Sequence, residues 1–356
     1  MTLLNPSVVL NKIDEIVIED RPVPKIEDPH YVKIAIKKTG ICGSDVHYYV
    51  HGCCGSFVVT APMVLGHESA GEVVEVGSAV KTLKVGDRVA CEPGIPSRYS
   101  AEYKSGNYNL DPDMAFAATP PYDGTLCRYY LLPEDYCVKL PDHVTLEEGA
   151  LVEPLSVGVH SCRLADVKFG DKLVVFGAGP VGLLVAAVGK AFGATDVLIV
   201  DIVEDKLQFA KKLGVATHIY NSSGDRGKSL TETKELHKAA FGDQLATVAI
   251  EATGNEYCIA SALHLLAPKG RYVQVGMGKE NLGLFPMGIV GEKELTIKGC
   301  FRYSVGDYET AVGLIASGKV QVKELVTHRF KFEQAIEAYE VVKSGKAIKA
   351  IIDGPE

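Results

Sequence analysis

The chain has 356 residues and a formal net charge of −8, with 47% hydrophobic and 23% charged residues. This composition is ordinary for a globular protein, and a chain of this length is expected to form two domains. The negative charge argues against nucleic acid as a partner, because nucleic-acid-binding proteins are usually basic. No uncharged apolar run is long enough to span a membrane, so no membrane partner is expected.

The start of the chain carries no recognisable targeting signal. Residues 1–6 lack the charged and apolar pattern that is typical of a secretion signal. The nine cysteines are therefore expected to be buried thiols or metal ligands rather than disulfides. We expect a cytoplasmic protein.

The first part of the chain predicts an all-β domain. Short alternating runs end at glycine or proline turns, and we expect strands at Ser7–Leu10, Ile16–Glu19, Tyr31–Lys37, Ala70–Val76 and Asp87–Cys91. These strands favour a partly closed β-barrel. Residues 93–125 are rich in proline and predict loops.

Potential metal ligands occur within this β domain and just after it. Cys42 offers a thiolate, His67 an imidazole, and Glu68 or Glu153 a carboxylate. Three protein ligands with an open fourth position are typical of catalytic zinc. Spacing alone leaves the question open, because a single Cys42 is equally typical of a buried thiol and a single His67 of a hydrogen-bonded core residue.

The middle of the chain predicts a βαβ unit with a dinucleotide-binding turn. The apolar run Lys172–Phe176 predicts a strand, Leu183–Phe192 a helix, and residues 196–200 a second strand. Between the first strand and the helix lie three glycines at the spacing G-x-G-x-x-G, namely Gly177, Gly179 and Gly182. Such glycines allow a tight turn, a close approach of the pyrophosphate to the backbone, and packing of the helix on the strand.

An acid at the end of the second strand indicates which dinucleotide binds. Asp201 lies 19 residues after Gly182 and could accept hydrogen bonds from both ribose hydroxyls. Its charge would repel a 2′-phosphate, so NAD is favoured over NADP. Lys206 could reach the adenosine ribose or phosphate, but it is equally typical of a solvated helix position.

The remaining elements complete a doubly wound α/β domain and return to the first domain. Strands are expected near Val174, Val197, His218, Val248 and Tyr272, alternating with helices, which predicts a parallel sheet. Residues 224–234 are polar and charged and predict a loop. Further elements are expected as helices over residues 154–164, 308–317 and 332–344 and a final strand over 348–352.

Several of these motifs resemble the zinc-containing medium-chain alcohol dehydrogenase superfamily. They are Gly66-His67-Glu68, Gly86-Asp87-Arg88-Val89 and the glycine turn at 177–182, in the order that the family has. Other segments resemble its polyol dehydrogenase branch, the xylitol and sorbitol dehydrogenases: residues 40–49, 118–121, 153–157 and 301–303. The resemblance implies an α/β protein with a GroES-like β-barrel catalytic domain, residues 1–157 and 297–356, and a Rossmann NAD-binding domain, residues 158–296.

The resemblance also implies roles for individual residues. One catalytic zinc would be held by Cys42, His67 and Glu68, with Glu153 beside the metal or occasionally on it. Ser44 and His47 match a proton relay, and Glu153 is the preferred general base. The substrate-contacting positions would be Tyr48, Glu153, Arg302 and Tyr303. The NAD-contacting positions would be the three turn glycines, Val181, Asp201, Lys206, Val275, Gly276, Met277, Phe301 and Arg302.

Two departures from the family pattern affect these expectations. Many members hold a structural zinc on four cysteines, but the corresponding stretch here has Ser97, Ser100, Tyr103 and Asp111. We therefore expect no structural zinc, and a loop that packing must hold. Cys53 and Cys54 also stand where polyol dehydrogenases usually have an arginine and an isoleucine. We expect incidental thiols there, because a disulfide between neighbouring cysteines is strained.

The implied activity is zinc- and NAD-dependent oxidation of a polyol secondary alcohol to a ketose, with xylitol to D-xylulose as the first expectation. Zinc would lower the pKa of the alcohol, and NAD would accept the hydride. The alternative substrate is D-sorbitol, which gives D-fructose. A zinc-free quinone reductase and a non-enzymatic dinucleotide-binding protein are alternatives that the intact Cys, His and Glu set disfavours. The partners would be the polyol and ketose and other copies of the chain, with a tetramer favoured.

Overall fold

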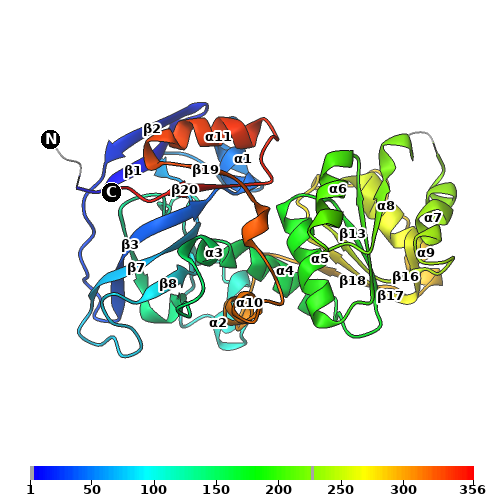
Figure 1. Cartoon of the computed structure of the whole chain (residues 1–356), viewed down its shortest axis with the longest axis horizontal. Helices are drawn as coiled ribbons and strands as arrows, with labels where there is room; N and C mark the ends of the chain where they lie inside the picture. Colours follow the sequence, from blue (N-terminus) through cyan, green and yellow to red (C-terminus); the bar gives the residue numbers. More distant parts are fainter. Residues whose placement is uncertain (1–3, 226–227) are drawn as a thin grey trace. The chain divides into compact units, whose positions relative to one another are not determined.

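Contacts divide the chain of the computed structural model into two units, Met1–Glu153 with Ser304–Glu356, and Pro154–Tyr303 (Figure 1). The structure describes residues 4–225 and 228–356. Residues 1–3 of the segment in which we expect no secretion signal therefore lie outside the described residues. The sequence placed the divisions after residues 157 and 296, whereas the contacts place them after 153 and 303. The difference arises because nearly all of helix α4 (Val152–Leu164) and the segment after the last sheet strand belong with the second unit.

The first unit is built mainly from β-strands. Its largest sheet has seven strands in the order β12-β8-β7-β3-β20-β19, with β11 paired to β3. Their bounds are β3 (Tyr31–Gly40), β7 (Glu68–Val76), β8 (Arg88–Cys91), β11 (Tyr129–Pro133), β12 (Cys137–Lys139), β19 (Val326–Phe330) and β20 (Lys349–Asp353). All pairs are antiparallel except β19 with β20. The late strand β20 thus joins a sheet of early strands, as the family resemblance implied.

Smaller sheets and short helices complete this unit. A three-stranded sheet has the order β2-β1-β6. The remaining bounds are β1 (Pro6–Lys12), β2 (Glu15–Asp20), β4 (Cys53–Cys54), β5 (Phe57–Val58), β6 (Met63–Val64), β9 (Gly94–Ile95), β10 (Ala115–Phe116), α1 (Gly43–His51), α2 (Ala101–Lys104), α3 (Leu146–Ala150), α10 (Asp307–Ala316) and α11 (Ala335–Lys343). One apolar core joins β1, α1, α11 and β20 through buried side chains such as Leu10, Tyr48, Tyr339 and Ile352.

The proline-rich stretch after β9 is held by one buried carboxylate. Asp111 is 6% exposed, and its Oδ2 accepts hydrogen bonds from Ser97 N at 2.7 Å and Ser100 Oγ at 3.0 Å. Its Oδ1 accepts another from Asp113 N at 2.9 Å. Asp111 therefore cross-links the region in which many family members have four cysteines.

The second unit contains a six-stranded sheet in the order β15-β14-β13-β16-β17-β18, and every pair is parallel. The strand bounds are β13 (Lys172–Phe176), β14 (Asp196–Asp201), β15 (His218–Asn221), β16 (Ala246–Glu251), β17 (Leu266–Gln274) and β18 (Thr296–Gly299). The helices are α4, α5 (Pro180–Phe192), α6 (Glu204–Lys212), α7 (Leu230–Ala239), α8 (Glu256–Leu265) and α9 (Met287–Glu292). The order reverses between β13 and β16, which is where doubly wound sheets bind ligands.

One predicted loop is partly wrong. Residues 226–227 of the predicted loop 224–234 lie outside the described residues, but α7 begins at Leu230. Ser229 caps this helix, since its Oγ accepts from Glu232 N at 3.2 Å while the Glu232 carboxylate accepts from Ser229 N at 2.8 Å. This reciprocal capping box starts a helix in spite of the polar composition.

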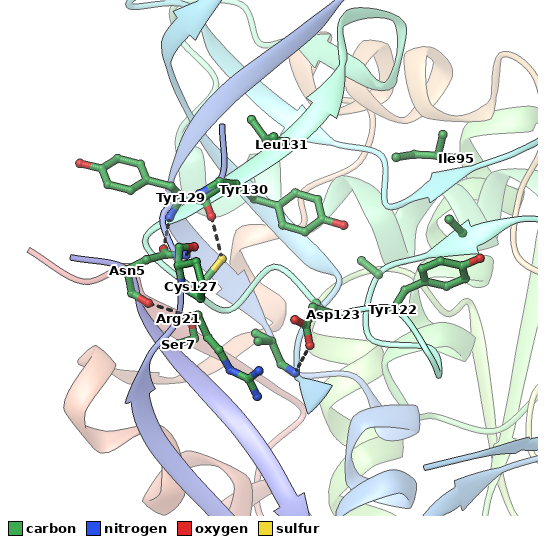
Figure 2. Close-up of a pocket in the computed structure, with 16 residues that line it drawn as sticks. Asn5, Ser7, Arg21, Ile95, Tyr122, Asp123, Cys127, Tyr129, Tyr130 and Leu131 are labelled. Atoms are coloured by element: carbon green, nitrogen blue, oxygen red, sulfur yellow. Dashed lines mark hydrogen bonds between the residues drawn. The ribbon is translucent and has the colours of Figure 1, made fainter. Parts of the chain in front are cut away.

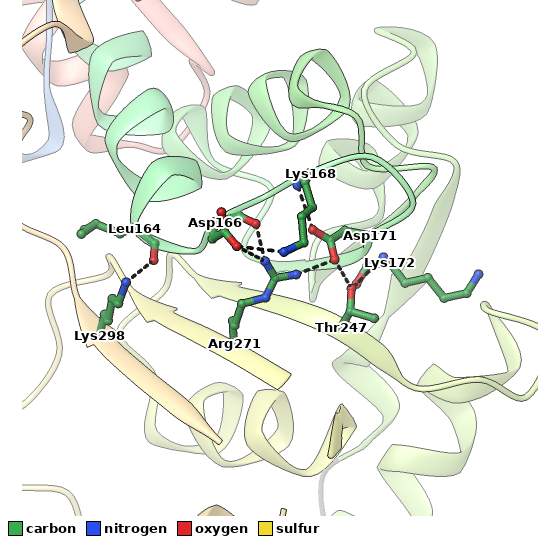
Figure 3. Close-up of polar contacts among 8 residues, drawn as sticks. All are labelled: Leu164, Asp166, Lys168, Asp171, Lys172, Thr247, Arg271 and Lys298. Atoms are coloured by element: carbon green, nitrogen blue, oxygen red, sulfur yellow. Dashed lines mark hydrogen bonds and ion pairs between the residues drawn. The ribbon is translucent and has the colours of Figure 1, made fainter. Parts of the chain in front are cut away.

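A polar network closes the edge of the sheet where strands β13 and β16 begin, and Arg271 of β17 joins it (Figure 3). The buried Asp171 carboxylate accepts from Thr247 Oγ1 at 2.7 Å and Lys168 N at 2.8 Å, and it pairs with Arg271. Arg271 also pairs with the exposed Asp166. The glycine turn and its neighbouring loops follow the carboxyl ends of the parallel strands, at the opposite edge of the sheet.

Candidate active site

The candidate metal ligands converge within the first unit. The ligand atoms of Cys42, His67 and Glu68 all lie within 4.8 Å of one another. Cys42 immediately precedes α1, and His67 precedes Glu68, the first residue of β7. His67 and Glu68 are buried, and Cys42 is half-buried. A thiol, an imidazole and a carboxylate at this separation form a donor set that fits zinc.

A buried aspartate, which the sequence interpretation missed, joins the two segments that carry the ligands. Asp45 is fully buried and accepts from Cys42 N at 3.3 Å and Gly66 N at 3.4 Å. Its Oδ1 also lies 3.4 Å from His67 Nδ1, which is buried without a well-directed hydrogen bond. Asp45 stands three residues after Cys42, at the position that closes a capping box, and this spacing is the signal that could have identified it.

The surroundings of His67 favour positive charge. Burial by itself lowers the pKa of this imidazole, but the charges of Asp45 and Cys42 outweigh burial and hold the pKa well above its ordinary value. The ring of Phe116 lies 5.7 Å from the imidazole, centroid to centroid, and contributes to the burial. A site that stabilises a proton among anionic side chains also suits a metal cation.

Glu153 lies outside the three-residue ligand group. It is the second residue of α4, and its side chain is 6% exposed. Burial is the largest influence on the pKa of two buried neighbours, raising that of Tyr308 and lowering that of Lys349, and the charge of Glu153 raises both pKa values. The structure thus places Glu153 near Lys349, which contacts Glu68 directly.

The remaining predicted residues on α1 have different environments. Tyr48 is 3% exposed, and burial raises its pKa to about 12, although a hydrogen bond with Thr119 opposes the shift. Its hydroxyl therefore stays protonated at neutral pH and can donate a hydrogen bond. Ser44 is half-buried, whereas His47 is exposed and lies 5.7 Å from the ring of His51.

The cofactor candidates converge within the second unit. Gly177 follows β13 with φ of 104°, and Gly179 is the N-cap of α5, which begins at Pro180. A Cβ on Gly182 would lie 1.9 Å from the Gly177 carbonyl oxygen, so the turn requires glycine there. A Cβ on Gly179 would meet nothing within 4 Å, which leaves open space beside the helix start. This is the environment in which a pyrophosphate binds.

Asp201 fixes the glycine turn as well as ending β14. Its Oδ2 accepts from Ala178 N at 2.7 Å, and its Oδ1 accepts from Val203 N at 2.9 Å. Val181 and Lys206 are half-buried on the following helices. The acid therefore lies directly beside the turn and still has lone pairs for further donors.

A second buried acid, also missed from sequence, organises the neighbouring loops. Glu251 is fully buried and accepts from Thr253 N and Gly254 N, both at 2.8 Å, and from Gln274 Nε2 at 2.7 Å. A Cβ on Gly276 would lie 2.3 Å from Gly254 N. Glu251 thus locks the loops after β16 and β17, including the predicted contacts Val275, Gly276 and Met277.

The last predicted positions lie at the end of the second unit. Phe301 is 39% exposed, and the Arg302 guanidinium lies 4.7 Å from the centre of its ring. Arg302 has φ of 55°, and Tyr303 is 1% exposed. The structure brings Cys42, His67 and Glu68 together in the first unit, and all the cofactor candidates belong to the second unit.

A separate cavity of about 390 Å³ in the first unit involves none of these residues (Figure 2). Its walls carry Arg21 and Asp123, and Asp123 accepts a hydrogen bond from Val64 N at 2.8 Å. Asn5 lies on the same wall and accepts from Tyr129 N at 2.9 Å. These two hydrogen bonds tie the segment just before β1 to β11 and the loop that carries Asp123 to β6.

Comparison with known proteins defines the class of protein. Residues 28–142 match the alcohol dehydrogenase GroES-like domain, and residues 180–317 match the zinc-binding dehydrogenase domain. The chain belongs to the zinc-binding medium-chain alcohol dehydrogenase family and is a dehydrogenase. The GroES-like and Rossmann folds expected from sequence are confirmed. No helix among residues 4–225 and 228–356 is both long and apolar enough to cross a membrane.

Individual relatives show which branch of the family the chain resembles. The chain is 58% identical to sorbitol dehydrogenase 2 of Saccharomyces cerevisiae and 54% identical to the D-xylulose reductase of Scheffersomyces stipitis, each over 99% of both chains. Among solved structures, 2R,3R-butanediol dehydrogenase from Bacillus subtilis is 32% identical with a TM-score of 0.87, over 99% of this chain and 100% of that one. The polyol dehydrogenase resemblance is confirmed.

Proposed function

We propose that this dehydrogenase oxidises a secondary alcohol of a polyol with NAD, converting xylitol to D-xylulose. The observation that carries the proposal is the convergence of Cys42, His67 and Glu68 in a chain whose relatives are named for sorbitol and D-xylulose. Residues 158–296 are assigned to NAD binding and the rest of the chain to catalysis.

One zinc ion per subunit would be held by Cys42, His67 and Glu68, and no structural zinc is proposed. When bound, zinc supplies a Lewis acid that makes a hydroxyl group more acidic. Glu153 is the proposed general base, because a buried carboxylate in this region can accept the hydroxyl proton. Direct coordination of the metal by Glu153 is the alternative role for this residue.

The other catalytic and substrate roles follow from donor chemistry. The protonated Tyr48 hydroxyl can donate to a substrate oxygen, and Arg302 and Tyr303 supply further donors for a polyhydroxylated chain. Ser44 and His47 are proposed to pass the proton onward. The exposure of His47 supports a position at the solvent end of that relay.

NAD is proposed as the cofactor on the basis of Asp201. Its carboxylate lies beside the glycine turn, where it would accept from ribose hydroxyls and repel a 2′-phosphate. The positive end of α5 would face the pyrophosphate. The other proposed contacts are Val181, Lys206, Val275, Gly276, Met277, Phe301 and Arg302.

An oligomer, with a tetramer favoured, is proposed from the edge of the second sheet. Strand β18 ends the sheet order and is exposed along its whole length, including Ile297. Phe285 and Met287 are further exposed apolar side chains before this strand. An exposed edge strand of this kind can pair with a second copy.

A cytoplasmic location is proposed because all nine cysteines are free thiols.

The test is NAD reduction measured with xylitol, D-sorbitol, ribitol and ethanol, before and after chelation of zinc. Activity with polyols that disappears on chelation and returns with added zinc is expected. Polyol activity that survives complete zinc removal would refute the proposed metal role. Reduction of quinones by NADPH without polyol activity would refute the proposed substrate class.

D-Sorbitol is the second candidate substrate, and the names of the sorbitol dehydrogenase relatives favour it. The kcat/KM ratio between xylitol and D-sorbitol, measured on the same zinc-loaded sample, separates the two candidates. A higher value for D-sorbitol would replace xylitol in the proposal and leave the metal and cofactor assignments intact.

A further inference from the structure

A buried lysine contacts one of the candidate metal ligands. Lys349 Nζ donates to both carboxylate oxygens of Glu68, each at 2.7 Å, and to the carbonyl oxygen of Ile41 at 3.1 Å. Lys349 is 4% exposed and Glu68 is 1% exposed. The ammonium group therefore uses its donors on the ligand itself and on the backbone just before Cys42.

Three neighbouring strands build this contact. Glu68 on β7 is paired with Gly40 on β3, Gly40 is paired with Ile351 on β20, and Lys349 begins β20. The Glu68 side chain lies over Gly40, where a Cβ would be 2.1 Å from Glu68 Oε2. The absence of a side chain at residue 40 thus lets the carboxylate reach the lysine across the sheet.

Charge explains why a lysine is useful here. The Cys42 thiolate and Glu68 would together cancel the two positive charges of a zinc ion, and Asp45 and Glu153 add further negative charge nearby. The Lys349 ammonium group, which contacts both oxygens of Glu68, supplies a positive charge next to this anionic group. A cation beside the ligand weakens the attraction between metal and carboxylate and leaves the metal more electropositive.

We propose that Lys349, which contacts both oxygens of Glu68 in this structure, is a positioning residue of the metal centre: with zinc bound it would keep one of these oxygens on its ammonium group and yield the other to the metal. The inference rests on the proposed zinc site. Glu68 would then offer the metal a single oxygen, and Lys349 would prevent the second oxygen from occupying a further ligand position. Lys349 would thus lower the affinity of the site for the metal, and the metal would be more electropositive and have one ligand position fewer occupied by Glu68.

The test compares Lys349→Met, Lys349→Arg and the wild-type protein. In Lys349→Met, Glu68 loses its counter-ion and the repulsion between the ammonium group and the metal cation disappears, so zinc should bind about tenfold more tightly in competition with a chelator. The cobalt-substituted variant should show weaker visible absorption per metal ion, because the coordination number rises. Lys349→Arg keeps the charge and the donors, and it should restore both wild-type values.

Lys38→Met is the matched control, since it removes an ion pair with Asp353 between the same strands β3 and β20 without touching a metal ligand. Its zinc affinity and cobalt spectrum should equal those of the wild type. If Lys349→Met does not fold, Lys349→Gln supplies a neutral side chain that still donates, and tighter zinc binding is again expected. Equal or weaker zinc binding by the neutral variants, with an unchanged spectrum, would overturn the proposal. Absence of zinc binding by the wild type would instead refute the proposed function.

Discussion

Replacement of Glu92 by glutamine should stabilise the protein at alkaline pH. Glu92 follows β8, is 5% exposed, and accepts a hydrogen bond from the Tyr108 hydroxyl. Burial is the main reason that its pKa rises from 4.5 to about 8, and the charges of Glu309 and Asp307 add to the rise, although the Tyr108 bond opposes it. Glutamine has nearly the same volume and keeps an oxygen for Tyr108, so the change removes mainly the charge.

The magnitude follows from the difference between the folded and unfolded pKa values. Between pH 4.5 and about 8 the folded chain holds a proton that the unfolded chain has lost, so the free energy of unfolding falls as the pH rises through this interval. At about 1.4 kcal/mol per pKa unit, the loss is on the order of 5 kcal/mol as an upper bound. Glu92→Gln should therefore match the wild type near pH 5 and exceed its stability by several kcal/mol above pH 8.

The assay is urea unfolding followed by circular dichroism from pH 5 to pH 9, because the chain has no tryptophan to report by fluorescence. The exposed Glu333, changed to glutamine, is the matched control and should show no pH-dependent gain. A stability difference between Glu92→Gln and the wild type that stays constant across this range would refute the reasoning.

Three further predictions test the cofactor turn and the loop that Asp111 cross-links. Asp201→Ala with Ile202→Arg should raise the NADP:NAD preference in kcat/KM by about tenfold or more, since removal of about 1.4 kcal/mol of repulsion is enough; negligible use of NADP would contradict the ribose assignment. Gly182→Ala should cost about 1–3 kcal/mol in urea unfolding, whereas Gly179→Ala, which meets nothing, should keep wild-type stability; equal stability of both variants would contradict the packing argument. Asp111→Ala should lower the free energy of unfolding by about 3 kcal/mol, because three donors lose their acceptor; a melting temperature equal to that of the wild type would show that packing alone holds the loop.

Local patterns predicted the regular elements and the glycine turn well. The strand Lys172–Phe176 has the predicted bounds, because a short apolar run before a glycine turn specifies a buried parallel strand. Helix α7 escaped prediction, since its polar composition concealed the capping signal at Ser229. Local signals thus fail where a single pair of side chains decides the start of an element.

Partners that are distant in the sequence could not be predicted in this way. Lys349 and Glu68 are separated by 281 residues, and their contact depends on the order of strands β7, β3 and β20. The sequence shows Glu251 only as the end of a buried strand. The folded loops reveal its four donors, which are the backbone N and the hydroxyl of Thr253, Gly254 N and Gln274 Nε2. Such residues depend on topology, which no spacing within a single segment encodes.

The position of β20 has a consequence for how the protein matures. A ribosome makes Cys42, His67 and Glu68 long before Lys349, although β20 lies beside β3 in the finished sheet. Until β20 docks, the Glu68 carboxylate has no counter-ion and the end of β3 is uncovered. A metal ion captured during synthesis would meet a more anionic and more retentive set of ligands than the mature protein offers. Docking of β20 would then lower the affinity of these ligands for the metal and complete the proposed catalytic centre.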